Sequence, residues 1–208
     1  MMELGINHNI PEAEYFAFDA CTNSRLTDMM DSPAESRFNI DNPLKPTPAM
    51  VLGSAVDCLV FTPSGFENKF IIYGQCLAPT AKGTQCSNTA SMTADFGQVC
   101  GIHGKNLAAI SDHRSPLTKD EVLLANAMRD AVYLHSTANQ ILNMCDGFQL
   151  SLLWEFHGMP CKARLDGAAW ELDSGTLVDL KKFNPKGVSE STEAFSRTLY
   201  QYGYFRQA

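Results

Sequence analysis

The sequence predicts an α/β domain that carries a small metal-binding insertion, and three observations support this prediction. Residues 147–156 and 161–183 alternate in polarity as the strands of a sheet do. Residues 48–61 and 118–142 have the apolar spacing and the capping residues of helices. Residues 76–103 contain three cysteines and a closing histidine in a stretch rich in Gly, Ser and Thr. A mixed central β-sheet flanked by helices, interrupted by one insertion, accounts for all three observations.

Length and composition limit the class of protein. A chain of 208 residues with 45% hydrophobic residues can bury one core and a small appendage. The net charge of −7 argues against a generally basic nucleic-acid coat, but it allows one local DNA groove that uses bound cations. No apolar run reaches the roughly 18 residues of a membrane span, and the N-terminus lacks the pattern of a secretory signal. The seven cysteines, some at metal-like spacing, favour a reducing cytoplasm over a disulfide framework.

The most informative stretch is a β-hairpin that carries two carboxylates and several basic groups. In its first strand, the alternation of side chains puts Lys162, Arg164 and Asp166 on one face. In its second strand, Asp179 and Lys181 share a face by the same rule. For Lys162 and Arg164 two interpretations stay open: contacts to DNA phosphates, or exposed hairpin charges.

The position of the turn decides which of these groups meet. A turn centred near residues 173 and 174 puts Asp166 across from Leu180 and Lys181, with Asp179 beside it. Asp179 lies in a run that is too apolar for an exposed edge, so we expect its carboxylate to be paired or bound to a metal. Two carboxylates and an ammonium in one place could hold a divalent cation and a water, although D-x-K triplets are more often solvated surface charges.

A third carboxylate lies in the middle of the helix predicted over residues 48–61. Asp57 stands among Val56, Cys58 and Leu59, where a carboxylate needs a partner. It either pairs with a neighbouring arginine or provides a third ligand to the metal of the hairpin. Ligands that offer only oxygen suit Mg²⁺ or Mn²⁺.

The insertion has the pattern of a structural zinc site. Cys76, Cys86, Cys100 and His103 follow the spacing C-x9-C-x13-C-x2-H. Three thiolates and an imidazole complete a tetrahedral Zn²⁺ shell. A segment this small has little core of its own and needs a bound metal to stabilise its fold. Free cysteines around a loop are the alternative. The predicted domains are an N-terminal helical part (1–75), the zinc-binding insertion (76–104) and a C-terminal core (105–208) that we expect to be truncated or to lack a C-terminal contact.

Several motifs in the same order resemble a known family. The chain is similar to exonuclease VIII, the RecE-type enzyme of the PD-(D/E)xK, restriction-endonuclease-like superfamily. The motifs are Thr47–Met50 with Gly53–Val56, then Cys161–Asp166, Val178–Lys181 and Tyr202–Gln207. The insertion is outside this similarity and resembles a small zinc-binding element of phage proteins.

The resemblance implies a Mg²⁺-dependent exonuclease that degrades double-stranded DNA from its ends, 5′ to 3′, in the cytoplasm of a bacterial host. It also implies a single-strand annealing protein as partner in phage-type recombination, and it leaves a homo-oligomer open. Asp166 and Asp179 would be metal ligands, and Lys181 would hold or activate the attacking water. The family usually has His where Asp57 stands. Gln207 matches the start of a DNA-contacting Q-x-x-x-Y motif whose tyrosine would fall beyond the last residue.

Two other functions stay open at this point. One is an endonuclease or nickase of the same fold. The other is a catalytically inactive, zinc-bearing module that binds DNA or a partner protein. The replacement of His by Asp57 and the missing tyrosine of the Q-x-x-x-Y motif favour the inactive module. The retention of Asp166, Asp179 and Lys181 together argues against it.

Overall fold

The computed structural model describes residues 3–95, 97–106, 113–171, 174–182, 196 and 200. The chain divides into two compact units. The first comprises Met1–Lys45 with Gln140–Ala208, and the second comprises Pro46–Asn139. These units reflect contacts within the structure. The division at residues 75 and 104 rests on sequence motifs instead, and it stays a prediction.

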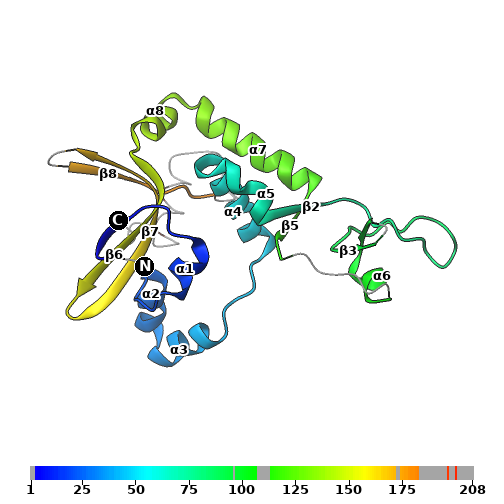
Figure 1. Ribbon diagram of the computed structural model, residues 1–208, viewed down its shortest axis with the longest axis horizontal. Helices are drawn as coiled ribbons and strands as arrows, with labels where there is room; N and C mark the ends of the chain where they lie inside the picture. The colour runs from blue at the N-terminus through cyan, green and yellow to red at the C-terminus, as the bar shows by residue number, and fades with distance from the viewer. Residues whose placement is uncertain are drawn as a thin grey trace. The chain divides into compact units, whose positions relative to one another are not determined.

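The first unit is built on a four-stranded antiparallel sheet with the order β1-β6-β7-β8 (Figure 1). The strands are β1 (Gly5–Asn7), β6 (Gly147–Phe156), β7 (Met159–Glu171) and β8 (Ser174–Val178). The turn between β6 and β7 consists of His157 and Gly158, both at positive φ (50° and 77°). Two such residues match the twist of the flanking strands, which explains the tight hairpin.

The edge of β7 that faces away from β6, here called its outer edge, forms backbone hydrogen bonds at two places. Near its start, the Cys21 N–H donates to the Pro160 carbonyl, and the Lys162 N–H donates to the Cys21 carbonyl, both at 2.8 Å. Near its end, residues from Gly167 onward pair with β8. The two attachments lie on either side of Asp166.

Three short helices accompany this sheet, namely α1 (Glu12–Ala17), α2 (Asn23–Asp31) and α3 (Pro33–Asp41). Thr22 and Ser32 cap α2 and α3 by accepting from backbone N–H groups. The helix α1 lies against the sheet, where Tyr15 and Ala20 pack on Leu153. Residues 1–22 show no periodic pattern in the sequence, so β1 and α1 were not predicted. A loop is predicted over residues 39–48, and it is shorter than that, because α3 continues to Asp41 and α4 begins at Pro48.

The second unit contains a pair of parallel strands and two packed helices (Figure 1). Its elements are α4 (Pro48–Phe61), the 3₁₀ turn η1 (Pro63–Gly65), α5 (Phe66–Lys69), β2 (Phe70–Tyr73), β5 (Ser115–Thr118) and α7 (Lys119–Leu134). The helix α4 packs on α7, and the Tyr133 hydroxyl donates to the Val60 carbonyl at 2.9 Å. The predicted capping box of Thr118 and Glu121 is confirmed. The sequence also predicts a strand over residues 66–73, and this prediction is half wrong, since the first four of these residues form α5.

The remaining elements are the insertion and the helix α8 (Ser136–Met144), which crosses from the second unit into the first. The insertion contains β3 (Met92–Ala94), β4 (Gly97–Val99) and α6 (Gly101–Asn106). Its small core consists of Cys76, Ala78, Cys86, Val99 and Cys100. The predicted α/β class, with a central sheet, flanking helices and a cysteine cluster, is confirmed.

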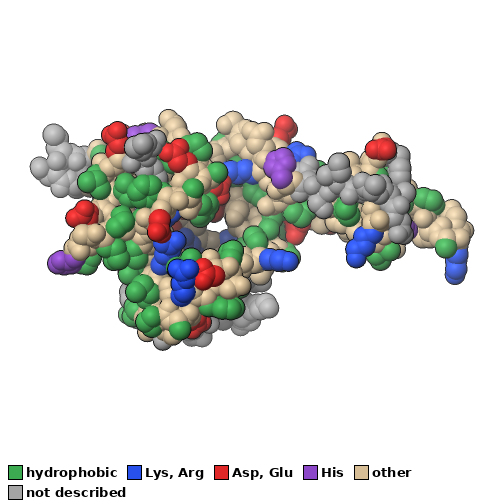
Figure 2. Space-filling view, turned by 60° about the horizontal axis from the view of Figure 1, so that its bottom comes forward, with side chains coloured by type: hydrophobic (Ala, Val, Ile, Leu, Met, Phe, Trp, Pro, Cys, Tyr) green, Lys and Arg blue, Asp and Glu red, His purple; other side chains and the backbone are tan. Residues whose placement is uncertain are grey.

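The surface agrees with a mixed rather than a basic charge distribution. On the face drawn in Figure 2, Lys and Arg side chains lie interspersed with Asp and Glu side chains. Within the described residues, no helix combines the length and the apolar character that a membrane span needs.

Candidate functional site

The hairpin of β7 and β8 brings the two predicted carboxylates together at the open end of β8. Gly167 pairs with Val178 in an antiparallel register. One further step in this register puts Asp166 opposite Asp179, rather than opposite Leu180 as the sequence suggested. The turn lies one residue earlier than expected, because Glu171 pairs with Ser174. Moving the centre of a turn by one residue shifts each cross-strand partner by two residues, so Asp179 takes the place that the sequence suggested for Leu180 and Lys181.

Asp166 is half-buried, and its carboxylate is held by hydrogen bonds. Its Oδ2 accepts from the Leu180 N–H at 2.8 Å. Burial raises the pKa of Asp166, and the nearby charge of Asp179 raises it further. The Leu180 N–H, the Lys181 ammonium and a hydrogen bond from the Gln149 side chain act in the opposite direction. The ionised form of Asp166 is therefore costly, although nearby donors support it. A bound cation would stabilise this ionised form.

Asp179 and Lys181 form an ion pair on the surface. The Lys181 Nζ lies 2.6 Å from the Asp179 Oδ1, and the two side chains are 33% and 53% exposed for the lysine and the aspartate. The premise that Asp179 lies in a buried run is therefore wrong, because β8 is the edge strand of the sheet. Exposed ion pairs contribute at most about 1 kcal/mol to stability, so this pair does little for the fold.

The donor set of this corner of the sheet fits a hard divalent cation. Asp166 and Asp179 offer carboxylate oxygens from adjacent segments, and such oxygens are the ligands that Mg²⁺ and Mn²⁺ prefer. The Lys181 ammonium lies beside the same carboxylates. Asp57 is half-buried on α4 in the second unit, so its part as a third ligand stays a prediction.

Lys162 has a structural place that the sequence did not indicate. It is only 4% exposed, and its ammonium donates to the carbonyls of Tyr15 (2.7 Å) and Phe18 (2.5 Å). It also lies 4.7 Å from the centre of the Tyr15 ring. These carbonyls end α1, where a cation satisfies the free acceptors of a helix. The sequence left two interpretations of Lys162 open, a phosphate contact and an exposed hairpin charge. Both are wrong for Lys162, because both require an accessible ammonium.

Arg164 also turns toward α1 and its flanking residues. Its Nη2 donates to the Ile10 carbonyl at 3.1 Å, and its guanidinium carbon lies 5.4 Å from the centre of the Tyr15 ring. Its Nε and Nη1 are buried and have no hydrogen-bond partner among the described residues. The same holds for the hydroxyl of Ser151, its cross-strand neighbour. A phosphate contact by Arg164 stays a prediction, and this geometry does not favour it.

The other DNA-contacting residue predicted from the sequence, Gln207, lies outside the described residues. The sequence also predicts a last helix that begins near Ser189 or Ser191, and most of its length lies outside the described residues as well.

The four predicted zinc ligands come together in the insertion. The ligand atoms of Cys76, Cys86, Cys100 and His103 all lie within 4.8 Å of one another. The His103 Nδ1 is 3.4 Å from the Cys76 Sγ and 3.5 Å from the Cys100 Sγ. Zn–S and Zn–N bonds of about 2.3 and 2.05 Å at a tetrahedral angle require an S···N separation of about 3.6 Å. The cluster therefore fits Zn²⁺ closely.

The surroundings of the cluster favour an ionised thiol at Cys100 and a neutral thiol at Cys86. The Asn88 N–H donates to the Cys86 Sγ at 3.5 Å, and the Asn88 side-chain amide donates to the Cys100 Sγ at 3.7 Å. The His103 N–H is the main cause that lowers the pKa of Cys100 to about 6. For Cys86, burial and the neighbouring thiols outweigh the Asn88 N–H and raise the pKa. Thiolates so close together repel each other, and a Zn²⁺ ion would remove this conflict.

Sequence reasoning missed three residues that shape these sites. Gln149 reaches Asp166, Asn88 binds two cysteines, and Tyr15 packs on Lys162. The proximity of Asn88 to Cys86 was visible in the sequence. The other two depend on which residues face each other across strands and helices, and no local pattern reveals this.

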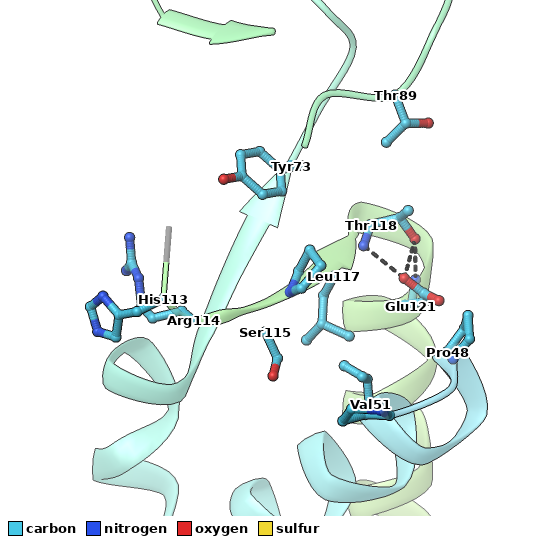
Figure 3. Close-up of a pocket in the computed structure, with 12 residues that line it drawn as sticks. Pro48, Val51, Tyr73, Thr89, His113, Arg114, Ser115, Leu117, Thr118 and Glu121 are labelled. Atoms are coloured by element: carbon cyan, nitrogen blue, oxygen red, sulfur yellow. Dashed lines mark hydrogen bonds between the residues drawn. The ribbon is translucent and has the colours of Figure 1, made fainter. Parts of the chain in front are cut away.

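A separate pocket of about 440 Å³ lies in the second unit (Figure 3). It runs along β5 and is closed by the first turns of α4 and α7, where Glu121 accepts from the Thr118 N–H at 2.8 Å. Its wall is largely apolar, with Tyr73, Val51 and Leu117 among the lining residues. None of the predicted catalytic residues lines it, within the part of the chain that the structure describes.

The comparison with known families agrees with the site on the hairpin. A family model described as a PDDEXK-like domain of unknown function (DUF3799) matches residues 17–208. No curated protein matches the chain. The match covers most of the chain, including the hairpin and the insertion, and it points to nuclease activity in general. The chain belongs to this PDDEXK-like family, and thereby to the PD-(D/E)xK nuclease superfamily.

Proposed function

We propose that the protein is a Mg²⁺-dependent nuclease that hydrolyses phosphodiester bonds of DNA at the Asp166 corner of the sheet. One observation carries this proposal: the β7–β8 hairpin gathers Asp166, Asp179 and Lys181 where the pairing of the two strands ends. The half-buried Asp166 is the costly member of this group, because burial and the charge of Asp179 both disfavour its ionised form, and a bound cation would offset that cost.

Each residue has a role that follows from its position. Asp166 and Asp179 would hold the cation, and Asp57 would add a third carboxylate. When bound, the cation neutralises phosphate oxygens, lowers the pKa of a water ligand and stabilises the leaving alkoxide. The Leu180 N–H orients the Asp166 carboxylate at 2.8 Å. Lys181, which pairs with Asp179, would position or activate the attacking water.

The finer function rests on the resemblance to the RecE-type enzymes. It supports an exonuclease on double-stranded DNA ends with 5′-to-3′ polarity, acting with a single-strand annealing protein in phage-type recombination. The Cys3His cluster, in which protein groups would fill all four positions, supports a structural Zn²⁺ with no direct part in hydrolysis.

The test compares linear with closed circular duplex DNA, each with Mg²⁺ and with EDTA. Variants Asp179→Ala and Asp166→Ala are compared with Asp41→Ala, in which an exposed carboxylate paired with Arg37 is removed far along the chain. We expect degradation of linear DNA only, loss of at least a factor of about 100 in both site variants, and full activity in the control.

The alternatives give different results in the same assay. Nicking or cutting of circles that depends on Asp166 and Asp179 points to an endonuclease of this fold. DNA binding without cleavage in any form of the protein contradicts the nuclease proposal and supports the inactive binding module. Activity that survives both substitutions contradicts the location of the site.

A further inference from the structure

We propose that Gln149 is a positioning residue that holds the Asp166 carboxylate in the orientation needed for metal binding. This inference rests on the proposed function, since it concerns the same carboxylate. Gln149 lies on β6, the strand that flanks β7 on the side away from β8.

The backbone of Gln149 is the first observation. Its φ is +52°, which is the left-handed region that side chains other than glycine rarely adopt. Two other described non-glycine residues have a positive φ: Asn9 lies in a bend, and His157 lies in the β6–β7 turn. Gln149 instead lies in the interior of a ten-residue strand. This conformation costs about 1–2 kcal/mol for a residue with a side chain.

The strand register does not shift at Gln149, although Gln149 and Asp166 themselves drop out of the ladder of paired residues. Phe148 pairs with Gly167, and Leu150 pairs with Leu165, so the register is the same on both sides of Gln149. A β-bulge would have inserted an extra residue and shifted the register by one. The unusual φ therefore serves something other than a change of register.

The cross-strand neighbour of Gln149 supplies a reason. The pairs on either side, Phe148 with Gly167 and Leu150 with Leu165, put Gln149 opposite Asp166. At this position the Gln149 side chain lowers the pKa of Asp166 as a hydrogen-bonding group. On the other side of β7, the Leu180 N–H donates to the Asp166 Oδ2. The carboxylate is thus held by donors from both flanking segments, while lone pairs remain for a cation.

Holding a ligand from its far side is how partners of metal-bound carboxylates act. Such partners fix the ligand in one orientation, and their removal usually weakens metal binding by about 10–100-fold. A strained backbone beside the site is also where strain is commonly retained for function. Gln149 thus supports Asp166 without touching the substrate itself.

The first experiment measures Mn²⁺ binding by electron paramagnetic resonance in the absence of DNA. Gln149→Gly removes the amide and accepts a positive φ, so we expect Mn²⁺ affinity to fall about 10–100-fold while the unfolding midpoint stays equal or rises. His157→Gly is the matched control, because it makes the same backbone change at an exposed turn, and we expect wild-type affinity. Gln149→Asn, which tolerates the same φ but has a shorter amide, should lose affinity like the glycine variant.

The second experiment needs no metal. The side-chain amide of Gln149 gives an NMR signal that should shift when Asp166→Ala removes its acceptor, and this signal should not respond to Asp41→Ala. An unchanged signal, or wild-type Mn²⁺ affinity in both Gln149 variants, overturns the inference while leaving the metal site intact. If the wild type binds no Mn²⁺ in a manner that depends on Asp166, the proposed function fails, and the NMR result alone decides the role of Gln149.

Discussion

Replacement of Lys162 by methionine should destabilise the first unit strongly, although Lys162 is not part of the proposed chemistry. The ammonium is buried and donates to the carbonyls of Tyr15 and Phe18 at 2.7 and 2.5 Å. A buried acceptor that loses its donor costs about 1–3 kcal/mol, so two such acceptors cost about 2–6 kcal/mol. Relief of the desolvation of the ammonium offsets part of this cost. We expect a net loss of about 2–4 kcal/mol in the free energy of unfolding.

The assay is urea denaturation followed by tryptophan fluorescence. Both tryptophans of the chain, Trp154 and Trp170, lie on β6 and β7, so the signal reports on the sheet that Lys162 supports. Lys181→Met is the matched control, because its ammonium is exposed and paired with an exposed carboxylate. It should lose less than about 1 kcal/mol, yet it should abolish nuclease activity.

The difference in unfolding free energy between wild type and Lys162→Met should depend on pH, and its direction follows from the pKa of Lys162. Burial lowers the pKa of Lys162 in the folded protein below its value in the unfolded chain. Between these two pKa values the unfolded chain binds more protons, so this group adds stability as the pH rises through the window. The difference in unfolding free energy between wild type and Lys162→Met should therefore increase from neutral pH toward the ordinary pKa of lysine. Equal stability of the two proteins at neutral pH, or a loss in Lys181→Met as large as in Lys162→Met, would refute the reasoning.

Three further outcomes follow from the second unit. Cys100→Ser should abolish stoichiometric zinc, measured by atomic absorption of the purified protein, whereas Asp179→Ala should retain it. Loss of zinc in both variants, or in neither, contradicts the division into two metal sites. Gly97→Ala should weaken zinc retention against a chelator, because a Cβ at this φ of +130° would lie 2.7 Å from the Leu77 Cδ1; unchanged retention would show that the insertion adapts. Thr118→Ala should lower the stability of α7 by about 1 kcal/mol through loss of its N-cap, measured by circular dichroism on heating, and an unchanged midpoint would contradict the role of the capping box.

Local patterns predicted the elements that are defined by neighbours in sequence. The helix from Pro48 to Phe61 and the strand from Gly147 to Phe156 were predicted with the bounds that the structure has. The capping box at Thr118 and the four clustered ligands of the insertion were likewise readable from spacing. In each case the residues that determine the feature lie close together in the chain, or a metal shell imposes their identity.

The failures have a common physical cause, which is contact between distant segments. Lys162 looks like a surface charge until α1 is placed over it, and α1 itself has too little periodicity to be recognised. Asp179 looks buried because its neighbours are apolar, but its strand lies at the edge of the sheet. The register of β7 with β8 changed with a single residue in the turn, and the role of Gln149 depends entirely on register.

The two attachments on the outer edge of β7 have a consequence for access to its middle. The Lys162 N–H points to this edge and donates to the Cys21 carbonyl, and by alternation the Arg164 N–H two residues on points the same way. Within the described residues, neither Cys21 nor β8 pairs with the strand between Ala163 and Asp166. Among the described residues, the stretch of β7 that carries Asp166 is therefore held by backbone hydrogen bonds at both ends, while its own outer edge has no strand partner. The backbone on either side of the Asp166 carboxylate is fixed without a neighbouring strand beside that residue.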